Sequence, residues 1–165
     1  MNDSFPERVR IRPAVSADVP RLIEMIRELA EFERLSDEVV ATEEGFRECL
    51  FGESPVAEAL VAENDDGPLG YAVFYPTFST FGGRAGIWLE DLYVRPDCRR
   101  RGVGKQMLKA VGEIARKRNA GRYEWAVLDW NRDAMDLYRR IGGEILEEWR
   151  IVRLDREGIE RLPRL

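Results

Sequence analysis

A strand, a turn and a helix follow one another in residues 91–108, and this stretch constrains the fold most. It reads D-L-Y-V-R-P-D-C-R-R-R-G-V-G-K-Q-M-L, an apolar run followed by a proline-containing turn, three arginines, two glycines and an amphipathic pattern. The first N–H groups of a helix have no partners within the helix and carry the positive end of its dipole. Glycines let an anion come close to them, so residues 99–105 are predicted to bind a phosphate or pyrophosphate.

The arginine run has a simpler interpretation as a solvated basic loop, but two glycines at a helix start favour phosphate binding. Two common phosphate motifs are absent. A P-loop needs a glycine where Arg99 stands and a Ser or Thr where Gln106 stands. The dinucleotide fingerprint needs a third glycine where Met107 stands. The sequence therefore predicts a phosphate-bearing ligand of another kind.

Composition limits the chemistry that the chain can perform. It has 165 residues, which predicts one domain over 1–165, and it contains no histidine. A general acid or base must therefore be Asp, Glu, Tyr, Lys, Cys or water. Cys49 and Cys98 give neither a disulfide framework nor a metal-ligand spacing, so we expect no metal. The net charge of −5 argues against nucleic acid as a partner and is compatible with a cationic substrate.

No apolar stretch approaches the roughly 20 residues of a membrane span, so no membrane partner is expected. The first ten residues contain no apolar signal core. We therefore expect a cytoplasmic protein.

Hydrophobic spacing predicts alternating strands and helices. Strands are predicted at 9–12, 57–63, 69–75, 87–94, 123–128 and 144–154. Helices are predicted to begin near Asp18 and to cover 42–50, 103–117 and 131–140, while 78–86 is a glycine-rich aromatic connection. Hairpins in the middle and crossover helices later imply an α/β (α+β) fold, with a mixed, mostly antiparallel sheet and helices on both faces.

Two adjacent carboxylates, Glu90 and Asp91, lie within an apolar strand. Neighbouring strand residues face opposite sides, so at least one of the two should face the interior or a cleft. A buried carboxylate is costly unless it is paired or functional. An ion pair with a nearby arginine is the structural alternative, and a functional role for one of the two is favoured.

Tyr138 lies on the predicted helix that follows Asp129-Trp130-Asn131, where a lone tyrosine is more often part of the core. Together with the loop R-x-x-G-x-G at 99–104 and the segment W-N-x-x-A-x-x-L-Y-x-x-x-G at 130–142, however, it resembles the GNAT superfamily of N-acetyltransferases. The resemblance covers nearly the whole chain. It is strongest to the spermidine/spermine and thialysine N-acetyltransferase branch, through I-R-P-A at 11–14, E-L-A-E-F-E at 28–33, L-E-D-L-Y-V at 89–94 and E-W-R at 148–150.

The resemblance implies a role for individual residues. Acetyl-coenzyme A is the implied co-substrate, with Tyr138 protonating the departing thiolate and Glu90 acting as the base, directly or through water. The implied acceptor is a small cationic amine. Its implied ligands are Glu33, Glu90 and Asp91. The implied cofactor-binding residues are Leu92, Tyr93, Val94, Arg99, Arg100, Arg101, Gly102, Val103, Gly104, Lys105, Asn131 and Tyr138.

The chain departs from the polyamine enzymes before this strand, where they carry an Asp and a Trp and this chain has Ser79 and Phe81. Fewer carboxylates disfavour spermine more than a shorter amine. The alternatives are a protein or peptide amino group as acceptor, and a non-catalytic module that senses acetyl-coenzyme A. The branch also implies a homodimer whose last strand contributes to the interface, with Trp149 and Ile151 as interface candidates; a core role for them is equally compatible with the sequence.

Overall fold

The computed structural model describes residues 9–164. The chain divides into two compact units, and the boundary in the sequence lies between Ala126 and Val127. The first contains the sheet and the helices that pack on it. The second contains two short helices and the segment that joins them.

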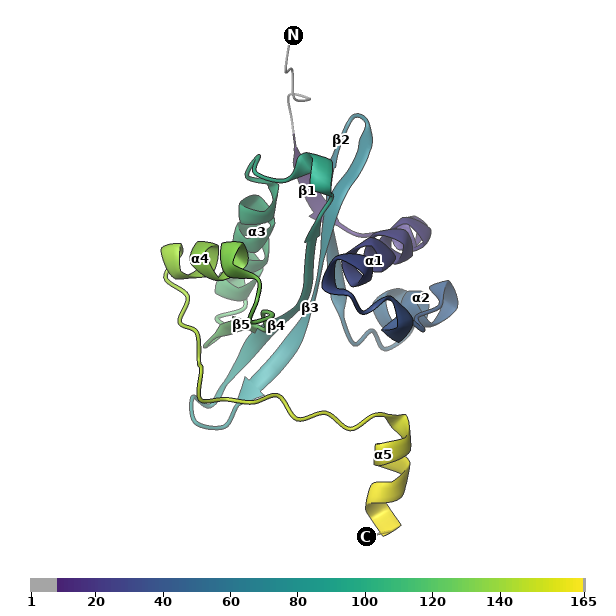
Figure 1. The fold of residues 1–165 in the computed structure, drawn as a ribbon, viewed down its shortest axis with the longest axis vertical. Helices are drawn as coiled ribbons and strands as arrows, with labels where there is room; N and C mark the ends of the chain where they lie inside the picture. The colour runs from purple at the N-terminus through teal and green to yellow at the C-terminus, as the bar shows by residue number, and fades with distance from the viewer. Residues whose placement is uncertain (1–8, 165) are drawn as a thin grey trace. The chain divides into compact units, whose positions relative to one another are not determined.

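The first unit contains a five-stranded sheet (Figure 1). Its strands are β1 (Arg10–Pro13), β2 (Glu58–Asn64), β3 (Gly67–Ser79), β4 (Arg84–Val94) and β5 (Tyr123–Trp125). They lie side by side in chain order. Every neighbouring pair is antiparallel except β4 and β5, which are parallel. The predicted mixed, mostly antiparallel sheet is therefore confirmed.

Helices cover both faces of this sheet, as predicted. Figure 1 shows α1 (Val19–Glu33) and α2 (Glu43–Phe51) on one side and α3 (Val103–Lys117) on the other. On the α1 side, Leu22 and Met25 pack against Tyr71 and Val73, alternate residues of β3. The bounds of α3 agree with the prediction, and Thr42 caps α2 by accepting a hydrogen bond from the Gly45 N–H at 3.1 Å.

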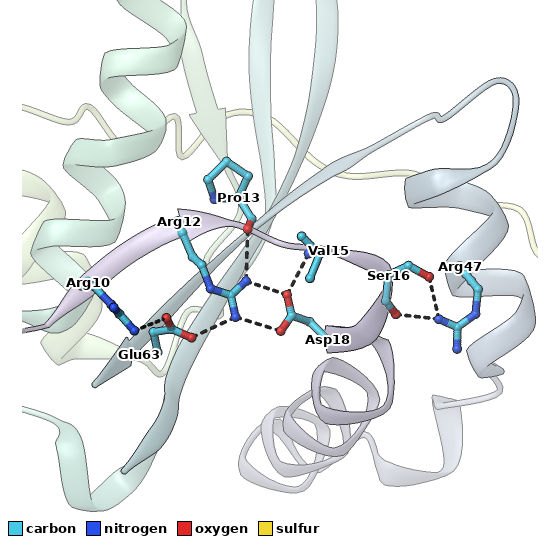
Figure 2. A network of polar contacts seen from close by, with 8 residues as sticks. All are labelled: Arg10, Arg12, Pro13, Val15, Ser16, Asp18, Arg47 and Glu63. Carbon is cyan, nitrogen blue, oxygen red and sulfur yellow. Dashed lines mark hydrogen bonds and ion pairs between the residues drawn. The ribbon is translucent and has the colours of Figure 1, made fainter. Parts of the chain in front are cut away.

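A group of ion pairs, here named the Arg12 network, joins β1 to β2 and to the start of α1 (Figure 2). The Arg12 guanidinium donates to both carboxylate oxygens of Asp18 at 2.7 and 2.9 Å, and to Glu63 at 2.8 Å. Arg10 donates to the second oxygen of Glu63, and Asp18 also accepts from the Val15 N–H. Arg12 thereby lowers the pKa of Asp18 and of Glu63.

The second unit contains α4 (Arg132–Arg140) and α5 (Arg156–Arg161). The prediction of a final strand at 144–154 is wrong, because these residues form an irregular connection between the two helices (Figure 1). A strand needs a neighbour to satisfy its backbone, and none of the described strands pairs with this segment. Trp149 and Ile151 are accordingly exposed. Helix α5 was not predicted.

Two further predictions need correction. The strand predicted at 123–128 ends at Trp125, so β5 is only half as long as expected. Most of the connection predicted at 78–86 is strand, because β3 continues to Ser79 and β4 begins at Arg84. In the part of the chain that the structure describes, no helix is long and apolar enough to cross a membrane.

Candidate functional site

A β-bulge in β4 decides where the two adjacent carboxylates lie. Val73 of β3 pairs with Asp91 and Phe74 pairs with Leu89, so Glu90 has no partner residue on β3. A bulge of this kind turns the extra residue out of the regular alternation. The hydroxyls of Tyr71 and Tyr75, four residues apart on one face of β3, donate to Asp91 and Glu90 respectively. Both carboxylates therefore face the same side, and the expected opposite orientation is wrong.

Glu90 is exposed and is held by two donors. Its Oε2 accepts hydrogen bonds from the Tyr75 hydroxyl at 3.2 Å and from the Trp88 indole at 3.0 Å. The structural alternative of an ion pair finds no support, because no arginine or lysine among the described residues pairs with Glu90 or Asp91. The side chain is thus fixed while its charge stays uncompensated.

Asp91 is half-buried beside it. Its Oδ2 accepts a hydrogen bond from the Tyr71 hydroxyl at 3.0 Å. Burial raises the pKa of Asp91 to about 6, and the charges of Glu90 and Glu33 act in the same direction, whereas the Tyr71 hydrogen bond opposes them. Burial also raises the pKa of Glu33, the last residue of α1.

The structure thus brings together the three carboxylates that the resemblance implies for the amine site. Glu33, Glu90 and Asp91 are here named the carboxylate cluster. Neighbouring like charges without a cation are unfavourable, and such groups with perturbed pKa values are typical of functional sites. A bound ammonium group would supply the missing positive charge. In residues 9–164, no group of three or more acidic or cysteine side chains is arranged to hold a metal ion.

The edge of β4 next to the cluster is open. Strand β5 pairs with β4 only from Ile87 to Leu89. Further along, the Arg95 N–H donates to the Leu69 carbonyl of β3 at 2.9 Å. Because backbone groups alternate along a strand, those of Leu92 and Val94 point to the opposite, open edge. The backbone groups of Tyr93 point to β3, and its buried side chain donates a hydrogen bond to Glu28 at 2.8 Å.

The predicted phosphate loop leads into α3 as expected. Gly102 precedes the helix with φ 81°, a left-handed conformation that favours glycine, and no side chain caps the helix there. The first N–H groups of α3 are therefore open to an anion. Arg99 does not extend into solvent like an arginine of a free loop, because its side chain contacts β4 and α1. Its Nε donates to the Val94 carbonyl at 2.9 Å, and its guanidinium lies 4.6 Å from the Phe32 ring centre.

The remaining loop residues divide by exposure. Val103 is buried and begins the helix, Gly104 contacts Val94, and the exposed side chains are those of Arg100, Arg101 and Lys105. Arg99 lines an open groove of about 510 Å³. The other residues that line it are Glu28, Glu31, Phe32, Tyr93, Arg95, Pro96 and Asp97.

Asn131 and Tyr138 belong to the second unit. The Asn131 side chain caps α4 by accepting a hydrogen bond from the Ala134 N–H at 3.3 Å. Tyr138 lies on the same helix and is half-buried, and burial raises the pKa of its hydroxyl. This phenol therefore stays protonated at neutral pH, as a proton donor must.

Sequence reasoning missed the donors that hold the carboxylates, which are Tyr71, Tyr75 and Trp88. The tyrosines share one face of a predicted strand, and this spacing was a usable signal. It did not show which carboxylate each tyrosine meets, because the bulge sets that register.

Comparisons with known proteins agree with this geometry. Residues 22–143 match the acetyltransferase (GNAT) family. Thialysine N-epsilon-acetyltransferase from Bos taurus is 41% identical, with 93% of this chain and 96% of that protein covered. An L-ornithine N5-acetyltransferase from Arabidopsis thaliana is 30% identical, with 94% of this chain and 88% of that protein covered.

Among solved structures, an integron cassette protein of V. cholerae has a TM-score of 0.77 at 24% identity, with 95% of this chain and 98% of that chain covered. This likeness concerns the fold. The chain belongs to the acetyltransferase (GNAT) family, and the resemblance read from its motifs is confirmed.

Proposed function

We propose that this chain is an N-acetyltransferase that transfers the acetyl group of acetyl-coenzyme A to a primary amine of a small cationic acceptor. The observation that carries the proposal is the carboxylate cluster, three acidic side chains without an ion-pair partner among the described residues. Two of its members, Glu90 and Asp91, lie on β4, where Leu92 and Val94 follow at the open edge.

The residues of the first unit fit acetyl-coenzyme A. This co-substrate supplies a thioester and a pyrophosphate. The uncapped first turn of α3, with Arg100, Arg101 and Lys105 around it, suits the pyrophosphate. The open N–H groups of Leu92 and Val94 and the open carbonyl of Leu92 suit the amide-containing arm, whereas the Val94 carbonyl is held by Arg99. In this proposal, one of these N–H groups donates to the thioester carbonyl. From the resemblance, Asn131 adds a contact in the second unit.

The cluster has two tasks with the acceptor. An alkyl amine has a pKa of about 10.4, so only about one molecule in 10³ is neutral at pH 7. The carboxylates bind the ammonium form, and one of them must then accept its proton. From the resemblance, Glu90 takes this proton, directly or through water, and Tyr138 protonates the thiolate.

Transfer is direct in this proposal, without an acetylated enzyme. Cys98 is the cysteine nearest the loop, but it is buried and burial raises the pKa of its thiol. The chain has no histidine to activate it.

The names of the relatives support an acceptor of amino-acid size, since they act on thialysine and L-ornithine. A diamine, a polyamine and a lysine-like amino acid all carry the required ammonium group. Ser79 and Phe81, in place of the Asp and Trp of the polyamine enzymes, favour the shorter acceptors.

The test is thiol release from acetyl-coenzyme A with putrescine, spermidine, spermine, lysine, thialysine, ornithine and a basic peptide as acceptors. We expect turnover on at least one small amine and little on the peptide. Glu33→Gln should raise the KM for the amine without changing that for acetyl-coenzyme A. Glu24→Gln, on the same helix but paired with Arg21, is the matched control and should change neither. Preferred turnover on the peptide, or binding of acetyl-coenzyme A without any turnover, would contradict the proposal.

We also propose that residues 1–165 act as a single acetyltransferase domain, since the family match runs from residue 22 to 143 and so includes parts of both units. Two free cysteines are compatible with the expected cytoplasmic location.

We propose a homodimer in which residues 144–154 contribute to the interface. Trp149 and Ile151 support this, because their side chains are 73% and 69% exposed although both are large and apolar. Light scattering should give a dimer mass for the wild type and a monomer mass for Ile151→Asp. A wild-type monomer at micromolar concentration would contradict this proposal.

A further inference from the structure

Tyr71 lies at the base of the carboxylate cluster. Its side chain is fully buried, with 0% exposed, and its hydroxyl donates to Asp91 Oδ2 at 3.0 Å. Its ring packs against that of Tyr93, with ring centres 6.1 Å apart, and belongs to the core formed with Leu22 and Met25 of α1. A side chain packed in this way has no room to rotate, so its hydroxyl is a fixed donor.

We propose that Tyr71 is a positioning residue of the amine site, whose hydroxyl holds the carboxylate of Asp91 in the orientation that meets the acceptor's ammonium group. The inference rests on the proposed function, because it concerns the binding of a cationic amine.

The hydrogen bonds leave one oxygen of Asp91 for a ligand. Oδ2 accepts the Tyr71 hydroxyl, whereas Oδ1 receives no hydrogen bond from the described residues. Fixing one oxygen of a carboxylate fixes the direction of the other. Tyr71 therefore directs Oδ1 without touching the acceptor, which is how a supporting residue prepares a binding group.

The charges around Asp91 make this donor necessary. The groups that act on Asp91 are Tyr71 from β3, Glu90 from β4 and Glu33 from α1. Burial and the two carboxylates favour the protonated form of Asp91, and only the Tyr71 hydrogen bond favours the charged form. Loss of the hydroxyl should therefore raise the pKa of Asp91 above its value of about 6 and leave less of the charged form at pH 7.

The chain offers a matched control in Tyr93. Both tyrosines are buried on the same face of neighbouring strands and their rings are in contact. The Tyr93 hydroxyl, however, donates to Glu28 rather than to Asp91. Tyr71→Phe and Tyr93→Phe therefore remove the same atom from similar surroundings, and only the first touches the carboxylate cluster.

The experiment is the pH dependence of kcat/KM for the preferred amine in the wild type, Tyr71→Phe and Tyr93→Phe. We expect the acidic limb of Tyr71→Phe to move up by about one pH unit, from about 6 to about 7. Through KM for the amine, this shift gives a loss of about twofold at pH 7 and of about ninefold at pH 5. Tyr93→Phe should keep the pH of the wild-type acidic limb, whatever change in the affinity for acetyl-coenzyme A it brings, because its hydroxyl bonds Glu28 and not Asp91. In an Asp91→Asn background, Tyr71→Phe should have no further effect, because Tyr71 acts through Asp91. Equal profiles for the two phenylalanine variants would overturn the inference.

A second pair of measurements keeps the inference testable if Tyr71→Phe does not fold or if no amine is turned over. Replacement of Tyr71 by 3-fluorotyrosine keeps the shape and strengthens the donor, so the acidic limb should move to lower pH. The carboxyl carbon of Asp91, followed by NMR, should titrate at lower pH in this protein and at higher pH in Tyr71→Phe. A wild type without turnover would refute the proposed function, whereas an Asp91 titration insensitive to both changes would refute the role of Tyr71.

Discussion

Two groups of carboxylates in the same unit have opposite surroundings. In the Arg12 network, Asp18 and Glu63 share one guanidinium, and their pKa values are lowered. In the carboxylate cluster, burial raises the pKa values of Asp91 and Glu33, and the charges of Glu90 and Glu33 raise that of Asp91 further. Carboxylates paired with a guanidinium stabilise the folded chain. Buried carboxylates without such a partner destabilise it, and a bound cation offsets this destabilisation. The comparison separates acidic residues that hold the fold from those that hold a ligand.

The largest effect is expected from Asp91→Asn on activity. The amide keeps an acceptor for the Tyr71 hydroxyl but removes the charge that an ammonium group requires. We expect kcat/KM for the amine to fall about 100-fold at pH 7.5, equivalent to about 2.7 kcal/mol. Steady-state kinetics measures this, and unchanged affinity for acetyl-coenzyme A is the control. A loss in kcat/KM below threefold would mean that the ammonium group of the acceptor does not bind at Asp91.

Arg12→Met should have the next largest effect, on stability rather than activity. It removes the guanidinium that Asp18 and Glu63 share, which leaves Asp18 without its ion pair and Glu63 with Arg10 alone. The Asp18 and Glu63 side chains are only 14% and 15% exposed. We expect a loss of about 2 kcal/mol in the free energy of unfolding, measured with urea. Arg10→Met is the control, because Arg10 is 64% exposed and bonds Glu63 alone; it should cost under about 0.5 kcal/mol. Equal losses of stability in Arg12→Met and Arg10→Met would mean that Arg12 stabilises the fold no more than an exposed arginine does.

Asp91→Asn should also stabilise the protein without ligand, by about 1–2 kcal/mol at pH 7.5. Burial makes the charged form of Asp91 unfavourable in the folded state, as its raised pKa shows. The neutral amide of Asn has no charge to bury, so most of this destabilisation is absent in the variant. Urea unfolding of both proteins, without acetyl-coenzyme A or amine, measures the difference. A destabilised variant would show that the negative charge of Asp91 supports the fold.

The pH dependence of stability should distinguish the two groups. Asp91 binds its proton more tightly in the folded state, so its unfavourable contribution exists above pH 6 and disappears as the pH falls towards 4. Asp18 and Glu63 bind theirs more weakly, so their favourable contribution persists at pH 6 and is lost below about 4. Between pH 7.5 and 5, the advantage of Asp91→Asn should shrink while the deficit of Arg12→Met stays. If the stability differences of both variants from the wild type changed equally with pH, the raised pKa of Asp91 and the lowered pKa values of Asp18 and Glu63 would be contradicted.

Much of the fold could be predicted because its signals are local. The apolar spacing of 103–117 defines a helix, and the short gap between the strands predicted at 57–63 and 69–75 defines a hairpin, both without reference to distant residues. The prediction of a strand at 144–154 was wrong because a strand depends on residues far away in the chain. The β-branched and aromatic residues of this segment favour a strand, but a strand exists only where a neighbour pairs with it, and no described strand does.

In the candidate site, too, local signals identified residues, whereas their arrangement depended on distant segments. Glu33, Glu90, Asp91 and the loop at 99–105 could be named from residue types and motifs. Their arrangement could not, because the alternation of a regular strand places Glu90 and Asp91 on opposite faces, and a single unpaired residue reverses that.

The sequence by itself determined the family and excluded histidine as a general acid or base, and it named the residues that we propose for the reaction. Only the tertiary structure decided that the two adjacent carboxylates share one face and that the charge of Glu33 acts on Asp91. It also decided that Tyr71 holds Asp91 and that Arg99 lies against Phe32. The physical reason is that motifs depend on residue type and local spacing, whereas burial, register and charge proximity depend on segments far apart in the chain.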